Sequence, residues 1–283
     1  MSKNESKTKI LVCCHNESKT VSNNVYMPIH CGKALSEIEL GIQPDNTGDN
    51  ISHLNPHYSE LTGMYWAWKN LNDIDYIGIC HYRRLFDFNK KSRPFMAWDA
   101  LDYDELDNYD YSIPNFEKIF KKKDIVLHKP YICQYDLRLM YCQGHLRDDF
   151  DKMERVIATQ TPEYSNAFKR VMYNNNRASL HNLLIMRKEE YDKLCSWMFS
   201  ILFQIEKETD YTSYSTFQKR MPAIMSERLV MIYVQKNKLR TKYYPYLWVI
   251  GKENKINFIN NFLSRIKNTL LFPLINFHSS ARE

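Results

Sequence analysis

The sequence predicts a layered α/β fold built on a mostly parallel β-sheet. Short apolar runs at residues 9–14, 76–80 and 124–130 have the length and composition of buried strands. Stretches with helical periodicity lie between and after these runs, and such alternation is typical of parallel sheets covered by helices. The chain has 283 residues and is 44% hydrophobic, so it can bury a sizeable core.

The other elements follow in order along the chain. Residues 41–55 are dense in Gly, Asp, Asn and Pro, which predicts a loop. A helix is predicted over residues 55–71, because Leu61, Met64, Tyr65 and Trp68 recur at i, i+3, i+4 and i+7. We then expect a charged helical stretch at 98–123, helices at 145–160, 188–207 and 221–238, and strands at 179–187 and 243–250.

The C-terminal segment differs in character from the rest. Residues 1–8 form a polar tail, residues 9–250 are expected to form one domain, and residues 251–283 an amphipathic basic tail. The apolar residues of this tail recur at helical spacing: Ile256, Ile259, Phe262, Leu263, Ile266, Leu270 and Leu271. Lys255, Arg265 and Lys267 flank them. The pattern fits either a helix lying in the plane of a membrane surface or a helix docked on the domain's own core.

Composition narrows the classes of partner. The net charge of +6 suits an anionic small ligand or an anionic membrane, and the chain lacks the dense Lys/Arg array typical of nucleic-acid binding. Seven cysteines without a CxxC pair indicate reduced thiols in the cytoplasm and give no zinc-site spacing. The N-terminus lacks the features of a signal peptide, and no run of about 18 apolar residues predicts a membrane span.

Polar residues follow the predicted strands where ligands bind in α/β sheets. His15 and Asn16 come after the first strand, and His81, Arg83 and Arg84 come at the end of the second. The planar guanidinium group suits phosphate oxygens, so Arg83 or Arg84 can neutralise a diphosphate without a metal. The alternative is a surface ion pair with the carboxylates at residues 99–110.

Other polar residues are candidates for binding or proton transfer. The turn with Asp45, Asp49 and Asn50 can contact ribose or a base, hold a metal through oxygen, or simply form a capped turn. Glu227 and Asp149 are candidate general bases, although acidic residues are also favoured near helix N-termini. His145 is a candidate donor to phosphate. Asn182 lies inside an apolar run, and a buried amide needs partners.

Together these motifs resemble one bacterial family. The motifs PDNTGDNIS, NPHYSELTGMYWAWKN, DYIGICHYRRLF, HLRDD, HNLLIMRKEEYDKLCSWMFSILF and SERLVMIYV occur in this order. Over residues 8–250 the chain resembles capsular and exopolysaccharide glycosyltransferases described as a domain of unknown function. The resemblance places these residues on family motif positions: Asp49, Asn50, Glu60, His81, Arg83, Arg84, His145, Asp149, Asn182, Glu227 and Arg228.

Two segments depart from the family pattern. Leu183 and Leu184 follow Asn182 where the family usually has Met and Phe, and both replacements stay apolar. His15 and Asn16 stand where a His-Lys pair is expected, which leaves the role of Asn16 open.

The resemblance implies a GT-A-like fold and a cytoplasmic enzyme on the inner face of the cell membrane. We expect transfer of galactose or galactofuranose from a UDP-sugar to a hydroxyl of an undecaprenyl-linked glycan, in capsule, exopolysaccharide or O-antigen synthesis. The tail would contact the membrane surface, and nucleic acid is not an expected partner. The expected donor-binding residues are His15, Asn16, Asp49, Asn50, His81, Arg83, Arg84, His145, Asn182 and Arg228.

Glu227 or Asp149 would deprotonate the acceptor if the reaction inverts, and the leaving phosphate can do so if it retains. No metal is required by this hypothesis; a variant of it holds Mn²⁺ or Mg²⁺ on Asp49 and Asp87. Two non-enzymatic hypotheses are a module that binds sugar nucleotides or glycans without turnover, and an interaction protein whose tail targets membranes.

Overall fold

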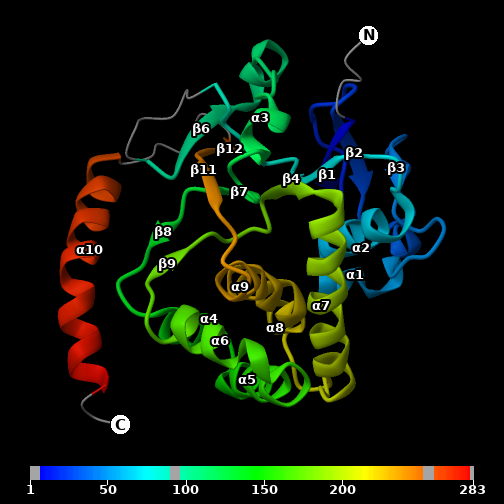
Figure 1. Ribbon diagram of the computed structural model, residues 1–283. Helices are drawn as coiled ribbons and strands as arrows, with labels where there is room; N and C mark the ends of the chain where they lie inside the picture. Colours follow the sequence, from blue (N-terminus) through cyan, green and yellow to red (C-terminus); the bar gives the residue numbers. More distant parts are fainter. Residues whose placement is uncertain (1–6, 90–95, 251–257, 281–283) are drawn as a thin grey trace. The chain divides into compact units, whose positions relative to one another are not determined.

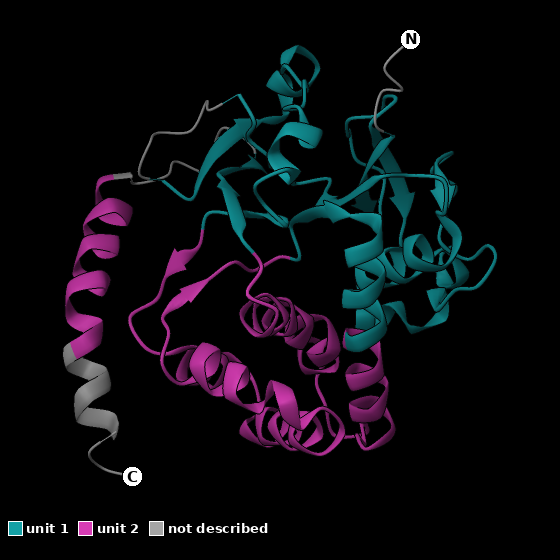
Figure 2. Cartoon of the chain, in the orientation of Figure 1, with its two compact units in different colours: residues 1–129, 182–197, 240–254 teal, residues 130–181, 198–239, 255–283 magenta. Residues whose placement is uncertain are grey.

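The chain divides into two compact units. The computed structural model describes residues 7–89, 96–250 and 258–280 (Figure 1). The first unit comprises Met1–Lys129, Asn182–Trp197 and Arg240–Asn254, and the second comprises Pro130–His181, Met198–Leu239 and Lys255–Glu283 (Figure 2). The domain boundaries expected near residues 8 and 250 stay predictions.

The first unit is built around a ten-stranded, mostly parallel sheet, as predicted. The main path runs β11-β7-β10-β4-β1-β2-β3, and β5, β6 and β12 extend it. Strand β10 is antiparallel to both β4 and β7, whereas the other neighbours on this path run parallel. The strands are β1 (Thr8–Cys14), β2 (Tyr26–His30), β3 (Gln43–Pro44), β4 (Tyr76–His81), β5 (Arg84–Phe86), β6 (Trp98–Asp102), β7 (Ile125–His128), β10 (Leu184–Arg187), β11 (Thr241–Tyr244) and β12 (Tyr246–Ile250).

Short helices connect these strands. They are the 3-10 helices η1 (Lys33–Leu35), η2 (Ser52–Leu54) and η3 (Tyr103–Asn108), the α-helices α1 (Asn55–Tyr58), α2 (Leu61–Asn70) and α3 (Phe116–Phe120), and the first half of α7 (Lys188–Lys207). Helix α2 buries Leu61 and Met64 completely, and the hydroxyl of Tyr191 on α7 donates to the carbonyl of Met64 over 2.8 Å. Apolar burial and this bond fix α7 to α2.

Central strand β4 needs a residue without a side chain at position 78. A Cβ atom on Gly78 would lie 2.8 Å from Cγ1 of Ile185 and 3.1 Å from Cγ1 of Ile10. These distances are shorter than van der Waals contact, so the neighbouring strands β10 and β1 close tightly over the glycine. Ile10, Ile77, Ile79 and Ile185 are fully buried around it.

The second unit is mainly helical. It contains α4 (Leu137–Gly144), α5 (Arg147–Gln160), the 3-10 helix η4 (Pro162–Tyr164), α6 (Ser165–Met172), α8 (Thr216–Lys219), α9 (Met221–Lys236), α10 (Phe258–Ser280), the second half of α7, and the antiparallel strands β8 (Tyr131–Ile132) and β9 (Arg177–Ala178). Helices α6 and α9 pack together. Phe150, Met172 and Leu229 are among its fully buried side chains. Within the described ranges, no helix has the length and apolarity needed to cross a bilayer.

The prediction of a helical stretch over residues 98–123 is wrong. Residues Trp98–Asp102 form β6, which pairs in parallel with β12, and only Phe116–Phe120 is α-helical. The carboxylate of Asp102 accepts a hydrogen bond from the backbone N–H of Asp104 and so starts a 3-10 turn. Local side-chain bonds of this kind compete with a continuous helix.

Other boundaries differ where single residues interrupt an element. The helix predicted over 55–71 is broken at Ser59, whose φ is 47°. The last predicted strand is two strands, β11 and β12, separated by Pro245, which has no backbone N–H to donate. The strand expected at 179–187 is shorter, since β10 spans only Leu184–Arg187. The helix predicted over 188–207 is confirmed.

The packing around Gly78 gives a stability prediction. Gly78→Ala should lower the free energy of unfolding by about 1–3 kcal/mol, because the added methyl group overpacks the sheet. Gly144→Ala is the matched control, since nothing lies within 4 Å of its Cβ position and Gly144 ends a helix. The control should leave stability unchanged or raise it by up to about 1 kcal/mol. Urea denaturation followed by circular dichroism checks both values; equal stability of the two variants would contradict the packing.

Candidate functional site

Histidines mark the carboxyl ends of four strands in the first unit. His15 follows β1, and His30, His81 and His128 end β2, β4 and β7. The strand register pairs Cys13 with His81 and Cys14 with His30, so β1, β2 and β4 end at one level. Ligands of α/β sheets bind beyond this edge. The edge is therefore the candidate site of the first unit.

Arg83 and Arg84 lie at this edge, and the guanidinium group of each lies over an aromatic ring. The Arg83 guanidinium is exposed and 5.0 Å from the ring centroid of Tyr82, which the His15 ring contacts edge-on at 5.3 Å. The Arg84 guanidinium lies 5.9 Å from the ring of Trp248. Across the described ranges neither arginine forms an ion pair with a carboxylate, so the predicted pairing with residues 99–110 does not occur there. Both cationic groups can accept an anionic ligand.

Asn182 lies at the same end of the sheet, and its side chain binds another residue of the chain. Its side-chain Nδ2 donates to Oε1 of Glu60 over 2.9 Å. Leu184 pairs with Ile79, so the antiparallel register places Asn182 at the level of His81. Asn182 is 3% exposed and has a left-handed φ of 52°. Glu60 is thus the hydrogen-bond partner that the buried Asn182 amide requires. Glu60 also lies on a family motif position.

Hydrogen bonds within the turn and from neighbouring segments hold residues 45–52 in place. Asp45 is fully buried and accepts from the backbone N–H groups of Gly32 and Lys33 at 2.8 and 3.0 Å. Asn50 bonds to the Gly48 carbonyl and to the Ser52 N–H. These contacts form a hydrogen-bonded turn, but neither η2 nor α1, which follow it, has a side-chain cap. A donor-binding role for Asn50 stays a prediction.

Asp49 and Asn16 are exposed and locally bonded. The Asp49 carboxylate accepts from the hydroxyl of Tyr65 at 3.1 Å and lies 3.9 Å from Nζ of Lys69. The carbonyl oxygen of the Asn16 side chain accepts from Oγ of Ser18 at 2.8 Å. Their predicted contact with the donor remains untested.

Asp49 and Asp87, the residues of the metal-bound variant, each have a protein partner. Asp87 is fully buried, and its carboxylate accepts from the hydroxyl of Tyr109 at 3.0 Å. Asp49 is bound instead to residues of helix α2. In the part of the chain that the structure describes, no three His, Cys, Asp or Glu residues lie close enough together to hold a metal ion. The metal-bound variant stays a prediction.

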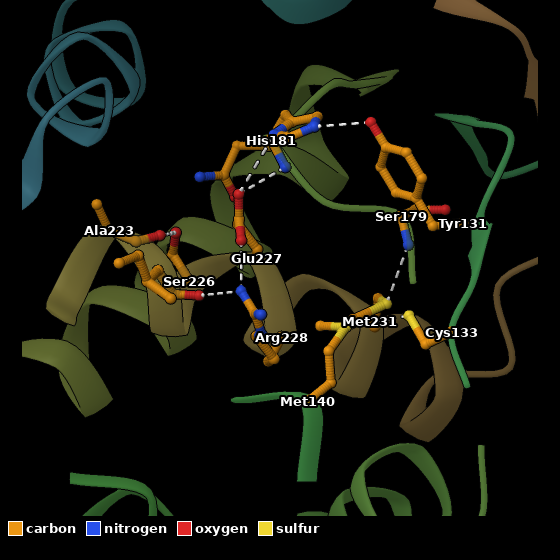
Figure 3. Close-up of polar contacts among 12 residues, drawn as sticks. Tyr131, Cys133, Met140, Ser179, His181, Ala223, Ser226, Glu227, Arg228 and Met231 are labelled. Atoms are coloured by element: carbon orange, nitrogen blue, oxygen red, sulfur yellow. Dashed lines mark hydrogen bonds and ion pairs between the residues drawn. The ribbon is translucent and has the colours of Figure 1, made fainter. Parts of the chain in front are cut away.

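Glu227 is the centre of a polar cluster in the second unit (Figure 3). It lies in the second turn of α9, where one carboxylate oxygen accepts from the backbone N–H of His181 at 2.7 Å and the other from the Arg228 guanidinium. Nδ1 of His181 is 3.8 Å from the first oxygen, and Nε2 is 3.1 Å from the hydroxyl of Tyr131. Hydrogen bonds to both oxygens fix the orientation of the carboxylate. Glu227 is thus a positioned carboxylate and a candidate proton acceptor.

Arg228 and His145 lie in a buried group with Tyr141. The Arg228 guanidinium is 5.6 Å from the Tyr141 ring, and the His145 ring centroid is 4.9 Å from it. Three buried polar atoms have no hydrogen-bond partner among the described residues: Tyr141 Oη, His145 Nδ1 and Arg228 Nε. Buried polar atoms in folded proteins usually have partners, so these atoms can serve a ligand or water. Arg228 also binds Glu227, which makes it a positioning residue as well as a predicted donor contact.

Asp149, the other predicted base, is more enclosed than Glu227. Its side chain is 2% exposed, compared with 14% for Glu227. It accepts from the hydroxyl of Tyr214 at 2.6 Å and lies 3.8 Å from Nζ of Lys152. Burial raises the pKa of the Asp149 carboxyl, which Tyr214 and Lys152 partly oppose. A carboxylate without access to solvent is the weaker candidate for contact with an acceptor.

Sequence reasoning missed three members of the Glu227 and His145 groups. They are Tyr131, Tyr141 and His181. His181 directly precedes Asn182 in the motif HNLLIM, and this position was its only signal. The tyrosines were indistinguishable among twenty tyrosines in the chain. Their contacts with His181, His145 and Arg228 depend on the tertiary fold.

The environment of His145 predicts a pH dependence of stability. Burial, together with the charge of Arg228, lowers the pKa of His145 to about 4. His145 binds a proton more readily in the unfolded chain than in the folded chain. The stability that the folded protein gains from keeping His145 neutral is therefore complete above about pH 6.5 and is lost as pH falls toward 4. Urea titrations of wild type and His145→Gln across this range should show a steeper loss in the wild type. Parallel pH profiles would contradict the lowered pKa.

Comparison with solved structures finds a glycosyltransferase. A structure described as WbbM, a bifunctional glycosyltransferase in its apo form, matches with a TM-score of 0.74 and 29% sequence identity. The match covers 88% of this chain and 47% of the other, so this chain spans about half the length of that protein. The match confirms the GT-A-like α/β fold class predicted from the sequence. A search of curated proteins finds no match.

A family model covers most of the chain. The model is described as a domain of unknown function, DUF4422, and it matches residues 9–238. This range includes all of the motifs that resemble the family, from PDNTGDNIS at residue 44 to SERLVMIYV, which ends at residue 234. The chain therefore belongs to the DUF4422 family.

Proposed function

We propose that the chain is a glycosyltransferase that moves a sugar from a UDP-sugar to a hydroxyl of a glycan acceptor. The observation that carries this proposal is the similarity to the WbbM glycosyltransferase, at 29% identity over 88% of the chain. The sheet edge with two arginines free of carboxylate partners in the described ranges supports it. An edge of this kind suits a nucleoside diphosphate.

The donor diphosphate binds Arg83 and Arg84 at the carboxyl edge of the sheet. During transfer, the bond between the sugar anomeric carbon and the β-phosphate oxygen breaks, and negative charge develops on the leaving UDP. Guanidinium groups stabilise this charge by donating paired hydrogen bonds to phosphate oxygens. Tyr82 and Trp248 support the two guanidinium groups through their ring faces. His15 and His81 belong to the same edge and are also proposed to contact the donor.

The acceptor hydroxyl must lose a proton as it attacks the anomeric carbon. Glu227 is the proposed base if the reaction inverts the anomeric configuration, because its carboxylate is oriented by hydrogen bonds and is less enclosed than that of Asp149. The N–H of His181 and the Arg228 guanidinium hold its carboxylate in place. If the reaction retains configuration, an oxygen of the leaving phosphate takes the proton instead.

The proposed donor sugar is galactose or galactofuranose, and the proposed acceptor is a lipid-linked glycan of a surface polysaccharide. Such an acceptor would place the enzyme on the cytoplasmic face of the cell membrane. Resemblance to capsular and exopolysaccharide enzymes supports this part. Selectivity among hexoses depends on a few hydrogen bonds to the sugar hydroxyls.

The alternative from another class is a non-catalytic protein that binds sugar nucleotides or glycans. It shares the arginine edge with the enzyme hypothesis but requires no base. Binding of UDP without release of UDP from any donor would favour it. The carboxylate of Glu227, fixed beside His181, supports the enzyme, since a binding module has no need of a proton acceptor.

The donor-binding role of the arginines can be tested with UDP itself. Arg83→Ala and Arg84→Ala should each weaken UDP binding about tenfold or more, since a charge-assisted hydrogen bond contributes about 1.5–3 kcal/mol. Lys9→Gln is the control, because it removes a positive charge at the amino end of the same sheet, where Nζ of Lys9 bonds to the Asn24 carbonyl. Isothermal titration measures all three. Wild-type UDP affinity in both arginine variants would rule out this role.

The base can be tested separately from donor binding. Glu227→Gln should lower donor turnover by about 100-fold or more while leaving UDP affinity within about twofold of the wild type. UDP-galactose and UDP-galactofuranose hydrolysis, with water in place of the acceptor hydroxyl, gives the readout. Asp149→Asn is the comparison and should have the smaller effect. Full turnover in Glu227→Gln would exclude Glu227 as the base and favour the retaining route.

A further inference from the structure

Helix α10 turns its polar side toward the second unit. Asn261, Arg265, Asn268 and Phe272 are the half-buried residues of its described side chains, and they recur at i, i+4, i+7 and i+11. Nη1 of Arg265 donates to the Pro130 carbonyl at 3.1 Å, and Nδ2 of Asn268 donates to the Ile132 carbonyl at 2.8 Å. The helix thus docks along β8 through polar contacts (Figure 1).

The opposite face of α10 is apolar and exposed. It carries six large side chains, called here the α10 stripe: Ile259, Phe262, Leu263, Ile266, Leu270 and Leu271. Leu270 is 68% exposed and Ile259 is 70% exposed. The described chain has eleven exposed large hydrophobic residues, and six of them lie on this helix. Apolar patches of this kind on a folded protein mark an interaction surface.

The helix that carries the α10 stripe is basic. Residues 258–280 contain no acidic residue; Lys267 is exposed, whereas Arg265 is half-buried on the side that faces β8. Burial lowers the pKa of the Arg265 guanidinium, and the charge of Arg177, an exposed residue of β9, lowers it further. The whole chain carries a net charge of +6. An occupant of this face should therefore combine an apolar surface with negative charge.

We propose that the α10 stripe lies in the interfacial region of a membrane that contains anionic lipids. An amphipathic helix with basic flanking residues lies parallel to such a surface and buries its apolar face among the acyl chains. The polar docking of α10 leaves this face outward on the second unit. The inference holds independently of the proposed glycosyl transfer, because it concerns binding to lipid alone.

A second copy of the chain fits the α10 stripe less well. Ile259, Leu263, Ile266 and Leu270 have coiled-coil spacing, but they span fewer than two full heptads, and Pro273 occupies the next core position. Coiled coils need about three to four sustained heptads. Phe262 and Leu271 also widen the stripe beyond a coiled-coil seam. Lipid accommodates such a short, broad stripe.

Vesicle flotation of the full chain, without donor or acceptor, tests the proposal. Wild type should float with phosphatidylcholine vesicles that contain phosphatidylglycerol and bind more weakly to phosphatidylcholine alone or at high salt. Ile266→Ser with Leu270→Ser should weaken binding about tenfold or more per residue. Leu35→Ser with Ile38→Ser is the matched control, since these side chains of the first unit are 60% and 44% exposed, against 43% and 68% for Ile266 and Leu270.

Three outcomes would overturn the proposal. Wild type fails to bind vesicles that contain phosphatidylglycerol, or the Ile266 and Leu270 variant binds them as tightly as the control variant. The third outcome is a dimer in light scattering that the Ile266 and Leu270 substitutions abolish, with no lipid binding by the wild type. That result would assign the stripe to a second copy of the chain.

Discussion

The chain holds two consecutive residues, His181 and Asn182, in left-handed backbone conformations with φ of 70° and 52°. Such angles cost free energy in residues other than glycine, although His and Asn tolerate them better than most. The cost is offset by the contacts that follow from them. The His181 N–H binds Glu227, and the Asn182 amide binds Glu60. Strand β10 starts two residues later and enters the sheet between β4 and β7.

The two candidate sets of residues differ in their electrostatics. At the sheet edge of the first unit, cationic groups rest on aromatic rings and lack carboxylate partners in the described ranges. In the second unit, the carboxylate of Glu227 is bound by a backbone N–H and a guanidinium. The first arrangement suits an anion and the second suits a proton acceptor. A glycosyltransferase that acts on a nucleotide sugar needs both functions, and a binding module needs only the first.

The sequence predicted the sheet and its edge better than the side-chain clusters. Apolar runs are continuous in β1 and β4, because strands buried on both faces leave little room for polar residues, and the polar residues that end them are conspicuous. The segment at 98–123 was mispredicted because its pairing with β12 depends on residues far along the chain. His181 and Tyr141 were missed for the same reason. His181 stands between a leucine and an asparagine, and this local sequence does not indicate a functional role. Its contacts with Tyr131 and Glu227 form only in the folded chain.

Release of UDP from a panel of UDP-sugars, measured with the purified full chain with and without EDTA, is the decisive test of glycosyl transfer. We expect slow release from one donor at a rate that EDTA does not change, since Arg83 and Arg84 supply the positive charge. No release from any donor would contradict glycosyl transfer. Release that requires added Mn²⁺ would contradict the role given to the arginines and return it to a metal.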